Sequence, residues 1–427
     1  NKSHSKDCKS LNEWLSYLET IHQTEIDLGL ARISQVAKRL RIDVSFARVI
    51  TVAGTNGKGT TCAFLENAFL DEKLNDKTSG EHSTTVGVYS SPHIEHFNER
   101  LRINKRNVDD QPLITAFEKI ESARAEISLS YYEYTTLAAL LVLMEVRPEV
   151  IILEVGLGGR LDATNIIDAD VAVITSVDLD HQAFLGNDRE TIGLEKAGIM
   201  RANQHIIVGD PNAPQSVLAH ANKVNNTGTT PTQYQQALTK VKIRNKDFFV
   251  TEQAITNKEA AQGWQWRCIE TDNAGKNKET CFTNLATTYI PQDNVASALM
   301  VLKQLGITLT TAKINALIAK TQVAGRTELF SKSSLIKQSV NKDNLVKNNI
   351  KIPCDVMFDV GHNPHAGRYL ANKLAELKSQ HQYHNIIAVT AMLADKDIEN
   401  TLAPFSDVID DWYIAPLAVP RAATTKQ

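Results

Sequence analysis

The stretch that decides the fold of this chain is Val49-Ile50-Thr51-Val52-Ala53-Gly54-Thr55-Asn56-Gly57-Lys58-Gly59-Thr60-Thr61. It begins with a short β-branched run, passes through glycines and a lysine, and leads into a helical pattern. A tight turn from a strand into a helix directs backbone N–H groups and the positive end of the helix dipole at an anion. The stretch therefore predicts a phosphate-binding loop. The other reading is a glycine-rich turn whose lysine faces solvent.

Within this loop, Lys58 is expected to reach the outer phosphates of a nucleotide, and a threonine hydroxyl is expected to face a magnesium ion. The pattern departs from the common form G-x-x-x-x-G-K-[ST]: Val52 stands at the first glycine, and Gly59 separates the lysine from the threonine. The residues predicted to bind the nucleotide here are Asn56, Gly57, Lys58, Gly59, Thr60 and Thr61.

Short β-branched runs recur along the chain, with helical patterns between several of them; they lie at 86–89, 150–153, 171–175 and 206–208. Continuous apolar runs of this kind are typical of strands that are covered on both faces of a parallel sheet. Apolar residues at helical spacing around Trp14 and around Ile33 predict two helices ahead of the loop. The sequence thus predicts an α/β fold built on a P-loop-type, mostly parallel sheet.

From Asn222 to about Thr283 the sequence is polar and alternating, which predicts an antiparallel excursion with strand-like pieces around Phe248, Phe249, Trp264 and Trp266. Helical periodicity returns at 294–305 and 311–319. A stretch rich in Lys, Asn and Ser follows at 331–353 and indicates an exposed insertion or linker.

Beyond this stretch, strands at 356–360, 386–389 and 412–414 and a helix at 365–377 predict a smaller, Rossmann-like α/β set. We therefore expect a first domain at 1–326 and a second at 327–427, and the sequence leaves open whether the second is complete.

Length and composition support this division. A chain of 427 residues is longer than one ordinary domain, and 42% hydrophobic side chains are enough to form substantial cores. A net charge of -3 gives no electrostatic reason to expect nucleic acid or an anionic membrane as a partner. The five cysteines are scattered without metal-ligand or redox spacing, which favours reduced thiols in a cytoplasm. The strongest apolar stretch, Leu137–Met144, is far shorter than the roughly 18 residues of a membrane span, so no membrane anchor is expected.

Two polar side chains follow strands at the edge where parallel sheets hold their ligands. Glu154 ends the run Val150–Leu153 and could ligate magnesium, directly or through water. A structural carboxylate that accepts from nearby backbone N–H groups is the alternative. His181 follows the run Val171–Thr175, and a histidine beside acids often belongs to an ordinary hydrogen-bond network.

Several runs together resemble the Mur ligase superfamily and, within it, the bacterial dihydrofolate synthase/folylpolyglutamate synthase branch. They are Val52–Thr60, Tyr89–His93, Leu153–Asn165, Leu179–His181, Glu195–Ile199 and Asp359–Pro364. The resemblance runs in order from Trp14-Leu15 to Asp410–Tyr413. It also accounts for the unusual loop, since the inserted Gly59 is the form found in the folate branch.

The resemblance implies roles for individual residues. Ser91 and Glu154 would hold a first Mg²⁺ ion and His181 a second, and a monovalent cation is also compatible with it. Lys196 matches a lysine that is carbamylated in the family, so the catalytic set would be Lys58, Glu154, His181 and Lys196. A surface lysine paired with Glu190 or Glu195 is the alternative for Lys196. Contacts to ATP are implied for Asn294, Arg326, Asp359 and His362.

The resemblance further implies a pocket for 7,8-dihydropteroate, formed by Leu28, Gly29, Leu30, Ala31, Ser130, Tyr131, Tyr132, Leu161, Asp162 and Ala163. The other substrates would be L-glutamate and reduced folates, and we expect a monomer. In the family's mechanism the substrate carboxylate attacks the γ-phosphate, Lys58 and magnesium neutralise the charge, and glutamate displaces phosphate from the acyl phosphate. Both activities are expected, because Asp27–Leu30 and Tyr131–Glu133 resemble the bifunctional bacterial enzymes.

Other functions predict different behaviour. A P-loop switch or transport ATPase would hydrolyse ATP without regard to pterins and would leave Glu195–Gly198 unexplained. A peptidoglycan-precursor ligase would need a nucleotide-sugar-binding domain ahead of the loop, where only about fifty residues stand. A monofunctional folylpolyglutamate synthase and an inactive descendant also stay open. The sequence departs from the family at Gly361, where alanine is usual, and in the 331–353 insertion.

Overall fold

The computed structural model describes residues 10–22, 24, 26–71, 84–225, 240–252, 263–271, 276–287, 290–331, 354–379, 383–417, 419 and 421–424. By its internal contacts the chain divides into two compact units, Asn1–Thr321 and Gln322–Gln427. All but the first residue of the predicted insertion at 331–353 lies outside the described residues. The expected boundary at 326/327 stays a prediction about where the functional domains divide.

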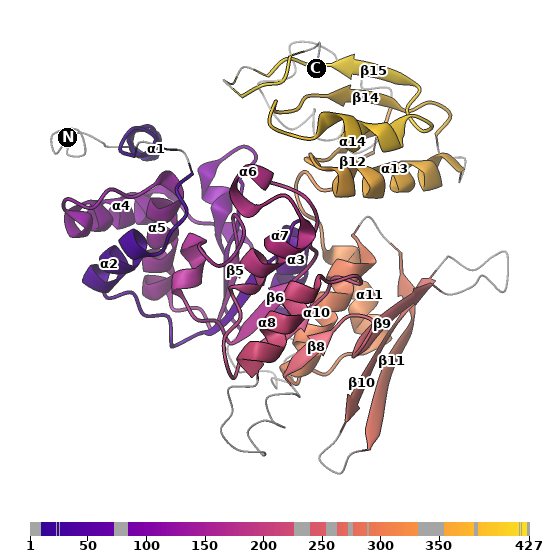
Figure 1. Ribbon diagram of the computed structural model, residues 1–427, viewed down its shortest axis with the longest axis horizontal. Coiled ribbons are helices and arrows are strands. Elements are labelled where there is room, and N and C mark those ends of the chain that lie inside the picture. The colour runs from indigo at the N-terminus through magenta and orange to yellow at the C-terminus, as the bar shows by residue number, and fades with distance from the viewer. Residues whose placement is uncertain are drawn as a thin grey trace. The chain divides into compact units, whose positions relative to one another are not determined.

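An eight-stranded sheet forms the centre of the first unit (Figure 1). Six strands run parallel, and β3 and β4 add antiparallel at one edge. In spatial order the strands are β4 (Arg106–Asn107), β3 (Leu101–Ile103), β2 (Val86–Tyr89), β5 (Val150–Glu154), β1 (Arg48–Ala53), β6 (Val171–Ile174), β7 (His205–Val208) and β8 (Val241–Ile243). The predicted α/β fold with a mostly parallel sheet is confirmed.

The register brings the carboxyl ends of the central strands to one edge. Val52 of β1 is paired with Glu154 of β5, and Ala53 is paired with Ile174 of β6. On the far side of β5, Tyr89 of β2 is paired with Leu153. The loops that follow β1, β2, β5 and β6 therefore start next to one another, at the edge where parallel sheets bind their ligands.

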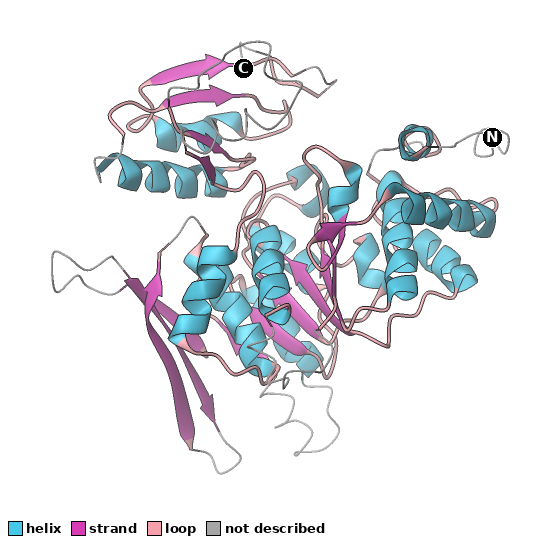
Figure 2. Ribbon diagram, turned by 180° about the vertical axis from the view of Figure 1, so that it is seen from behind, coloured by secondary structure: helices cyan, strands magenta, loops and turns pink. Residues whose placement is uncertain are grey.

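Helices cover both faces of this sheet (Figure 2). One face packs against α3 (Lys58–Phe69), α10 (Gln292–Gln304) and α11 (Thr311–Lys320). The other packs against α1 (Leu11–Leu18), α2 (Ala31–Leu40), α4 (Asp110–Arg124) and α5 (Tyr131–Val146) at one end, and α7 (Arg189–Ala197) and α8 (Gln215–Asn225) at the other. Successive residues of β5 point to opposite faces of the sheet: Ile152 belongs to the core on the first face, and Ile151 belongs to the core on the second.

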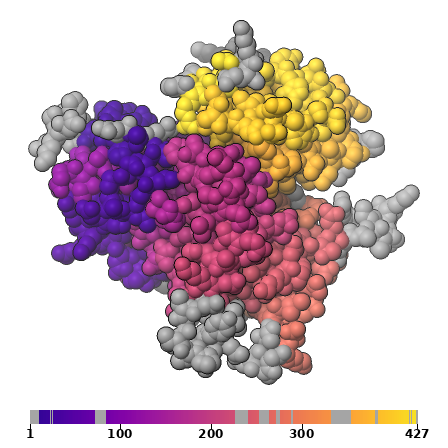
Figure 3. Space-filling model, in the orientation of Figure 1, coloured from indigo at the N-terminus to yellow at the C-terminus, as the bar shows by residue number. Residues whose placement is uncertain are grey.

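In the space-filling view, the indigo N-terminal segment and the magenta segment that contains α6 (Gln182–Leu185) and α7 are both seen on the face turned to the viewer (Figure 3). The described residues of this unit also form the short helices η2 (Phe97–Arg100) and η3 (Ala163–Ile166). Within the described residues, none of the helices combines the length and the apolarity that crossing a bilayer requires.

The antiparallel excursion is confirmed, but its extent differs from the prediction. The observed sheet consists of β9 (Phe248–Glu252), β10 (Gly263–Thr271) and β11 (Asn277–Ala286), with β10 in the middle. Residues 222–225 still belong to α8, and β8 joins the main sheet parallel to β7. Three residues are too few for periodicity to separate a parallel edge strand from a hairpin strand.

The second unit contains α13 (Pro364–Ser379), α14 (Ile398–Leu402) and η4 (Ala403–Phe405). Its described strands pair two by two: β12 (Glu328–Phe330) runs antiparallel to β13 (Val356–Phe358), and β14 (Ile387–Thr390) runs parallel to β15 (Asp411–Ile414). Ala371 of α13 packs with Phe405 and Ile409 in a small core. The predicted smaller α/β set is therefore present.

Candidate functional site

The predicted phosphate loop forms the turn between β1 and α3. Gly57 is the residue before the helix and has a left-handed φ of 84°, which favours glycine. Lys58 is the first residue of α3, and its Nζ donates to the carbonyl oxygens of Gly54 (2.9 Å) and Thr55 (3.3 Å). The ammonium group therefore lies over its own loop, at the amino end of the helix, where an anion would bind.

Two neighbouring residues approach this loop so closely that Gly54 and Gly57 have no room for a side chain. A Cβ atom at Gly57 would overlap the amide of Asn294 in α10, and one at Gly54 would overlap the hydroxyl of Thr175 after β6. Asn294, a predicted nucleotide contact, is thus buried directly against the loop. The glycines are needed because the backbone is approached from both sides.

Glu154 and Ser91 reach the same place from β5 and from the end of β2. The Ser91 N–H donates to Glu154 Oε2 at 3.4 Å. A Cβ atom at Gly59 would lie 3.6 Å from Glu154 Oε1, so the inserted glycine faces this buried carboxylate. The hydroxyl of Thr61 is buried and has no hydrogen-bond partner in the described part of the chain, and Thr60 beside it is buried as well.

His181 ends the loop that follows β6. Its backbone is left-handed, with φ 50°, and its N–H donates to Asp180 Oδ1 at 2.8 Å. Its Nε2 lies 3.9 Å from the same carboxylate oxygen, and the side chain is 34% exposed. A carboxylate, a serine and an imidazole are ligand types that divalent cations accept, so Ser91, Glu154 and His181 fit the predicted metal site in their chemistry.

Lys196 is buried near the end of α7, with 3% of its surface exposed. Burial and the Lys58 ammonium lower the pKa of Lys196 to about 7, while Asp180 and Asp162 oppose this shift. The amine therefore lies within electrostatic reach of the phosphate-loop lysine and of the acid next to His181.

The alternative reading of Lys196 as a surface lysine paired with Glu190 or Glu195 is wrong. Glu190 accepts from the N–H groups of Gln215 and Ser216, and Glu195 pairs with Arg160 at 2.8 Å. The backbone of Gly159 lies directly against this end of α7: a Cβ atom there would lie 2.8 Å from the Glu195 carbonyl oxygen and 2.9 Å from that of Lys196. Only glycine lets the loop after β5 lie on α7 this closely.

An aromatic pair flanks the loop after β5. Tyr132, in the first turn of α5, stacks on Tyr89 of β2 with ring centroids 6.2 Å apart and an interplanar angle of 28°. A Cβ atom at Gly156 would lie 2.7 Å from Tyr132 Cζ, so this ring covers the start of the loop. Burial raises the pKa of Tyr132 well above its usual value, which keeps its hydroxyl neutral.

Asp162 and Ser130, both predicted to line a substrate pocket, also hold the local backbone. Asp162 Oδ1 accepts from the N–H and the hydroxyl of Thr164, and its Oδ2 accepts from the Leu157 N–H at 2.9 Å. Burial raises the pKa of Asp162. Ser130 caps α5 by accepting from the Glu133 N–H. Leu161 and Ala163 flank Asp162 in the same loop.

The predicted segment Leu28, Gly29, Leu30 and Ala31 leads into α2 and is held to α5 by Arg32. The Arg32 guanidinium lies 2.8 Å from an Asp27 oxygen and 3.3 Å from a Glu133 oxygen. Leu30, Tyr131 and Tyr132 pack on one core cluster. Burial raises the pKa of Tyr131 to about 12. The segment that leads into α2 and the first turn of α5 therefore pack on the same hydrophobic core.

The other predicted nucleotide contacts belong to the second unit. Asp359 follows β13, and its two oxygens accept from the Thr327 N–H (2.7 Å) and the Gly361 N–H (2.6 Å). Arg326 is exposed next to Thr327, and His362 Nδ1 lies 2.9 Å from the Val360 carbonyl oxygen. Asp359 thus joins the two loops that carry Arg326 and His362.

Several residues at this edge were not among the predicted site residues. Tyr89 supports Tyr132, Thr175 and Ser176 hold the phosphate loop, and Asp180 acts on Lys196. Each of them ends or follows a predicted strand, and Tyr89 and Asp180 also belong to the runs Tyr89–His93 and Leu179–His181, which carry the family resemblance.

Comparisons with known proteins find relatives along nearly the whole chain. Residues 52–259 match the Mur ligase middle domain. The dihydrofolate synthase/folylpolyglutamate synthase of Escherichia coli is 39% identical over 417 residues, which cover 98% of this chain and 84% of the relative. The protein of the same name from Haemophilus influenzae is 37% identical over 421 residues, 98% of this chain and 85% of the relative.

Solved structures extend the likeness to the fold. E. coli FolC in complex with DHPP and ADP has a TM-score of 0.78 at 39% identity, covering 98% of this chain and 86% of that one. The bifunctional folylpolyglutamate synthase/dihydrofolate synthase with Mn, AMPPNP and L-glutamate bound has a TM-score of 0.76 at 37% identity, covering 98% and 86%.

Proposed function

This chain belongs to the dihydrofolate synthase/folylpolyglutamate synthase family of Mur ligases, and we propose that it uses ATP to join L-glutamate to 7,8-dihydropteroate and to reduced folates. The observation that carries the proposal is the meeting of Lys58, Glu154 and Lys196 at one edge of the sheet. A phosphate loop alone would support only nucleotide binding. A buried amine with a lowered pKa next to that loop is typical of a functional site, and the ligase reaction is proposed from the family to which the chain belongs.

ATP is proposed to place its phosphates on residues 54–61, where Gly57 lets Asn294 approach the loop. Lys58 carries the positive charge for the transferred phosphoryl group. Arg326, Asp359 and His362 are also proposed to contact the nucleotide, because the family resemblance implies it. In this proposal the functional domains are 1–326 and 327–427.

Two Mg²⁺ ions are proposed, one held by Ser91 and Glu154 and one by His181. When bound, the ions withdraw negative charge from the phosphate oxygens of ATP. The carboxylate at the end of β5 is suited to this role, because it is buried and faces Gly59 of the phosphate loop.

The chemical problem is that a carboxylate oxygen is a poor leaving group. We propose that the substrate carboxylate attacks the γ-phosphorus of ATP, which releases ADP and forms an acyl phosphate. The amine of glutamate then attacks the acyl carbon, phosphate leaves, and the amine loses a proton. Lys58 and the loop N–H groups hold the phosphoryl oxygens through the first step.

Lys196 is proposed to be carbamylated. With a pKa of about 7, about half of the amine is uncharged at neutral pH and can add to carbon dioxide, losing one proton to give a carbamate. The product is an anion within electrostatic reach of Lys58. It would replace a buried cation, which burial disfavours, by a group that pairs with the neighbouring lysine.

The pterin is proposed to bind beside the aromatic pair Tyr89 and Tyr132, with Asp162 at the loop that the ring covers. The pocket would also be lined by Leu28, Gly29, Leu30, Ala31, Ser130, Tyr131, Leu161 and Ala163. A cytoplasmic location is proposed as well, because the four described cysteines are free.

The test is phosphate release with ATP, magnesium and glutamate, while dihydropteroate or a reduced folate is offered in turn. We expect release to depend on the acceptor and to occur with both acceptors. Turnover with the folate alone would mean a monofunctional folylpolyglutamate synthase. Phosphate release that is indifferent to either acceptor would mean an ATPase and would sink the proposal.

A further inference from the structure

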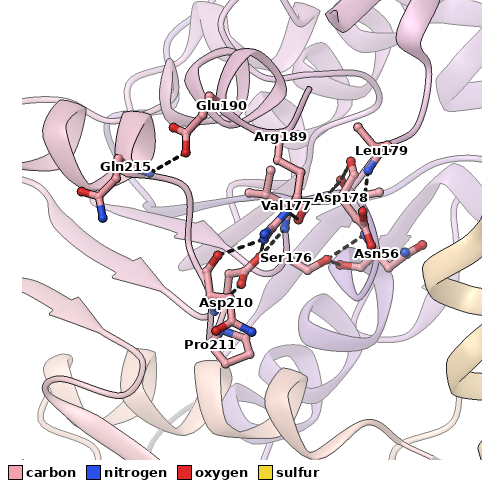
Figure 4. A network of polar contacts seen from close by, with 12 residues as sticks. Asn56, Ser176, Val177, Asp178, Leu179, Arg189, Glu190, Asp210, Pro211 and Gln215 are labelled. Carbon is pink, nitrogen blue, oxygen red and sulfur yellow. Dashed lines mark hydrogen bonds and ion pairs between the residues drawn. The ribbon is translucent and has the colours of Figure 1, made fainter. Parts of the chain in front are cut away.

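The phosphate loop rests on the loop that follows β6, residues 175–181 (Figure 4). The N–H groups of Thr55 and Asn56 donate to the carbonyl oxygen (2.8 Å) and the hydroxyl (3.1 Å) of Ser176. In return, the Thr175 hydroxyl donates to the Asn56 carbonyl oxygen at 2.6 Å. The backbone of the phosphate loop is therefore fixed by its neighbour rather than by its own hydrogen bonds alone.

A second contact ties the two loops together further along. The Thr55 hydroxyl donates to the carbonyl oxygen of Asp178 and accepts from the Asp178 N–H, each at 3.0 Å. His181 lies three residues beyond Asp178 on the same loop. A shift of this loop would thus move the phosphate loop and the imidazole together.

Two side chains outside this loop form hydrogen bonds with the backbone of Val177, in the middle of the loop (Figure 4). Asp210, which follows β7, accepts from the Val177 N–H at 2.7 Å. Arg189, the first residue of α7, donates from Nε to the Val177 carbonyl oxygen at 2.8 Å. Both polar backbone atoms of Val177 are held, and its side chain is buried in the core under α7.

Asp210 and Arg189 are themselves held in place by contacts with Asn212 and with each other. Asp210 is 4% exposed, and its second oxygen accepts from the Asn212 N–H at 2.7 Å. Arg189 Nη2 donates to the Asn212 carbonyl oxygen at 2.9 Å and lies 3.4 Å from Asp210. Because Arg189 begins the helix that carries Lys196, these contacts connect that helix to the phosphate loop.

We propose that Arg189 and Asp210 are positioning residues for nucleotide binding, which act through Val177 on the loop that supports Thr55 and Asn56. The inference rests on the proposed binding of ATP at the phosphate loop. Neither side chain needs to touch the nucleotide. Without Asp210 the buried N–H of Val177 loses its acceptor, and the loop is expected to rearrange to satisfy it.

The test compares Asp210→Ala and Arg189→Ala with Glu190→Ala. Glu190 is the matched control, because it lies next to Arg189 on α7 and ties that helix to the start of α8 through the N–H groups of Gln215 and Ser216. In the described part of the chain, the hydrogen bonds of the Glu190 carboxylate go to Gln215 and Ser216 and not to residues 175–181. A merely structural role for Arg189 would make its removal resemble the removal of Glu190.

The readouts are the Kd for ADP by calorimetry, the KM values for ATP and for dihydropteroate, and the melting temperature. We expect the Kd for ADP and the KM for ATP to rise about tenfold in both Asp210→Ala and Arg189→Ala. This is the scale of the free energy of one lost hydrogen bond to a charged group. The KM for dihydropteroate should stay unchanged. Glu190→Ala should lower the melting temperature and leave the Kd for ADP as it is.

Asp210→Asn keeps one carbonyl oxygen for the Val177 N–H, so it should restore most of the affinity. If Asp210→Ala does not fold, Arg189→Ala still decides, since the arginine side chain is 40% exposed. Unchanged ADP binding in Arg189→Ala, or an equal loss in Glu190→Ala, overturns the inference alone. A wild-type protein that binds no adenine nucleotide overturns the proposed function and this inference with it.

Discussion

Replacing Lys196 by methionine should stabilise the fold while it abolishes ligase activity. The side chains are similar in length, but methionine places no charge in the buried site. Lowering the pKa of Lys196 from 10.5 to about 7 corresponds to about 5 kcal/mol against the charged form, at about 1.4 kcal/mol for each pH unit. Lys196→Met removes that cost.

The gain depends on pH, and its sign follows from proton linkage. Between about pH 7 and 10.5 the folded wild type binds fewer protons at Lys196 than the unfolded chain does, so its stability rises with pH. The stability difference between Lys196→Met and wild type should therefore be greatest below pH 7, at about 5 kcal/mol, and fall to about 3 kcal/mol at pH 8.5.

The assay is urea unfolding of both proteins at matched pH values in buffer freed of carbon dioxide, followed by tryptophan fluorescence. Trp14, Trp264 and Trp266 are buried in the same unit as Lys196 and report its unfolding. Adding bicarbonate should then stabilise the wild type alone, because the variant lacks the buried Lys196 amine that is proposed to form a carbamate. A difference that does not change with pH, or a variant less stable than wild type at pH 6, would refute the reasoning about Lys196.

Two further substitutions separate the parts of the site. Lys58→Ala should abolish phosphate release and leave the circular dichroism spectrum unchanged, since the side chain is half-buried and the two hydrogen bonds given above go to its own loop. Full activity in this variant would remove the phosphate loop from the mechanism. Gly156→Ala would push on the Tyr132 ring, 2.7 Å from the new Cβ atom, so the KM for dihydropteroate should rise while the Kd for ADP stays constant. An effect of Gly156→Ala on ADP binding alone would contradict the assignment of Tyr132 to the pterin pocket.

Local patterns carried much of the fold. The runs that were expected to be strands at 49–53, 86–89 and 150–153 match β1, β2 and β5, because continuous β-branched runs are stable in few other settings. β8 was missed, since its three residues lie in a polar stretch and become a strand only by pairing with β7. Periodicity needs length, and pairing partners are not visible in a local window.

The candidate site shows the same division. The order of strand, glycine-rich turn and helix placed Lys58 at the start of α3, and the end of an apolar run placed Glu154 at the sheet edge. The sequence could not settle whether Lys196 was buried, because burial depends on segments that are distant along the chain, and one of these, the loop at Gly159, lies against the backbone of α7. No pattern in the sequence predicts the hydrogen bonds of Arg189 and Asp210 to Val177. An arginine and an aspartate are usually surface residues, and these contacts form only in the folded chain.

The sequence by itself thus determined the phosphate loop, the strands around it and the family, since these depend on residues that are neighbours along the chain. Only the tertiary structure decided that Lys196 is a buried amine with a pKa of about 7 and that Asn294 closes over Gly57. Both are effects of desolvation and close approach between distant segments. Such effects arise only when the chain has folded and water has been removed from between them.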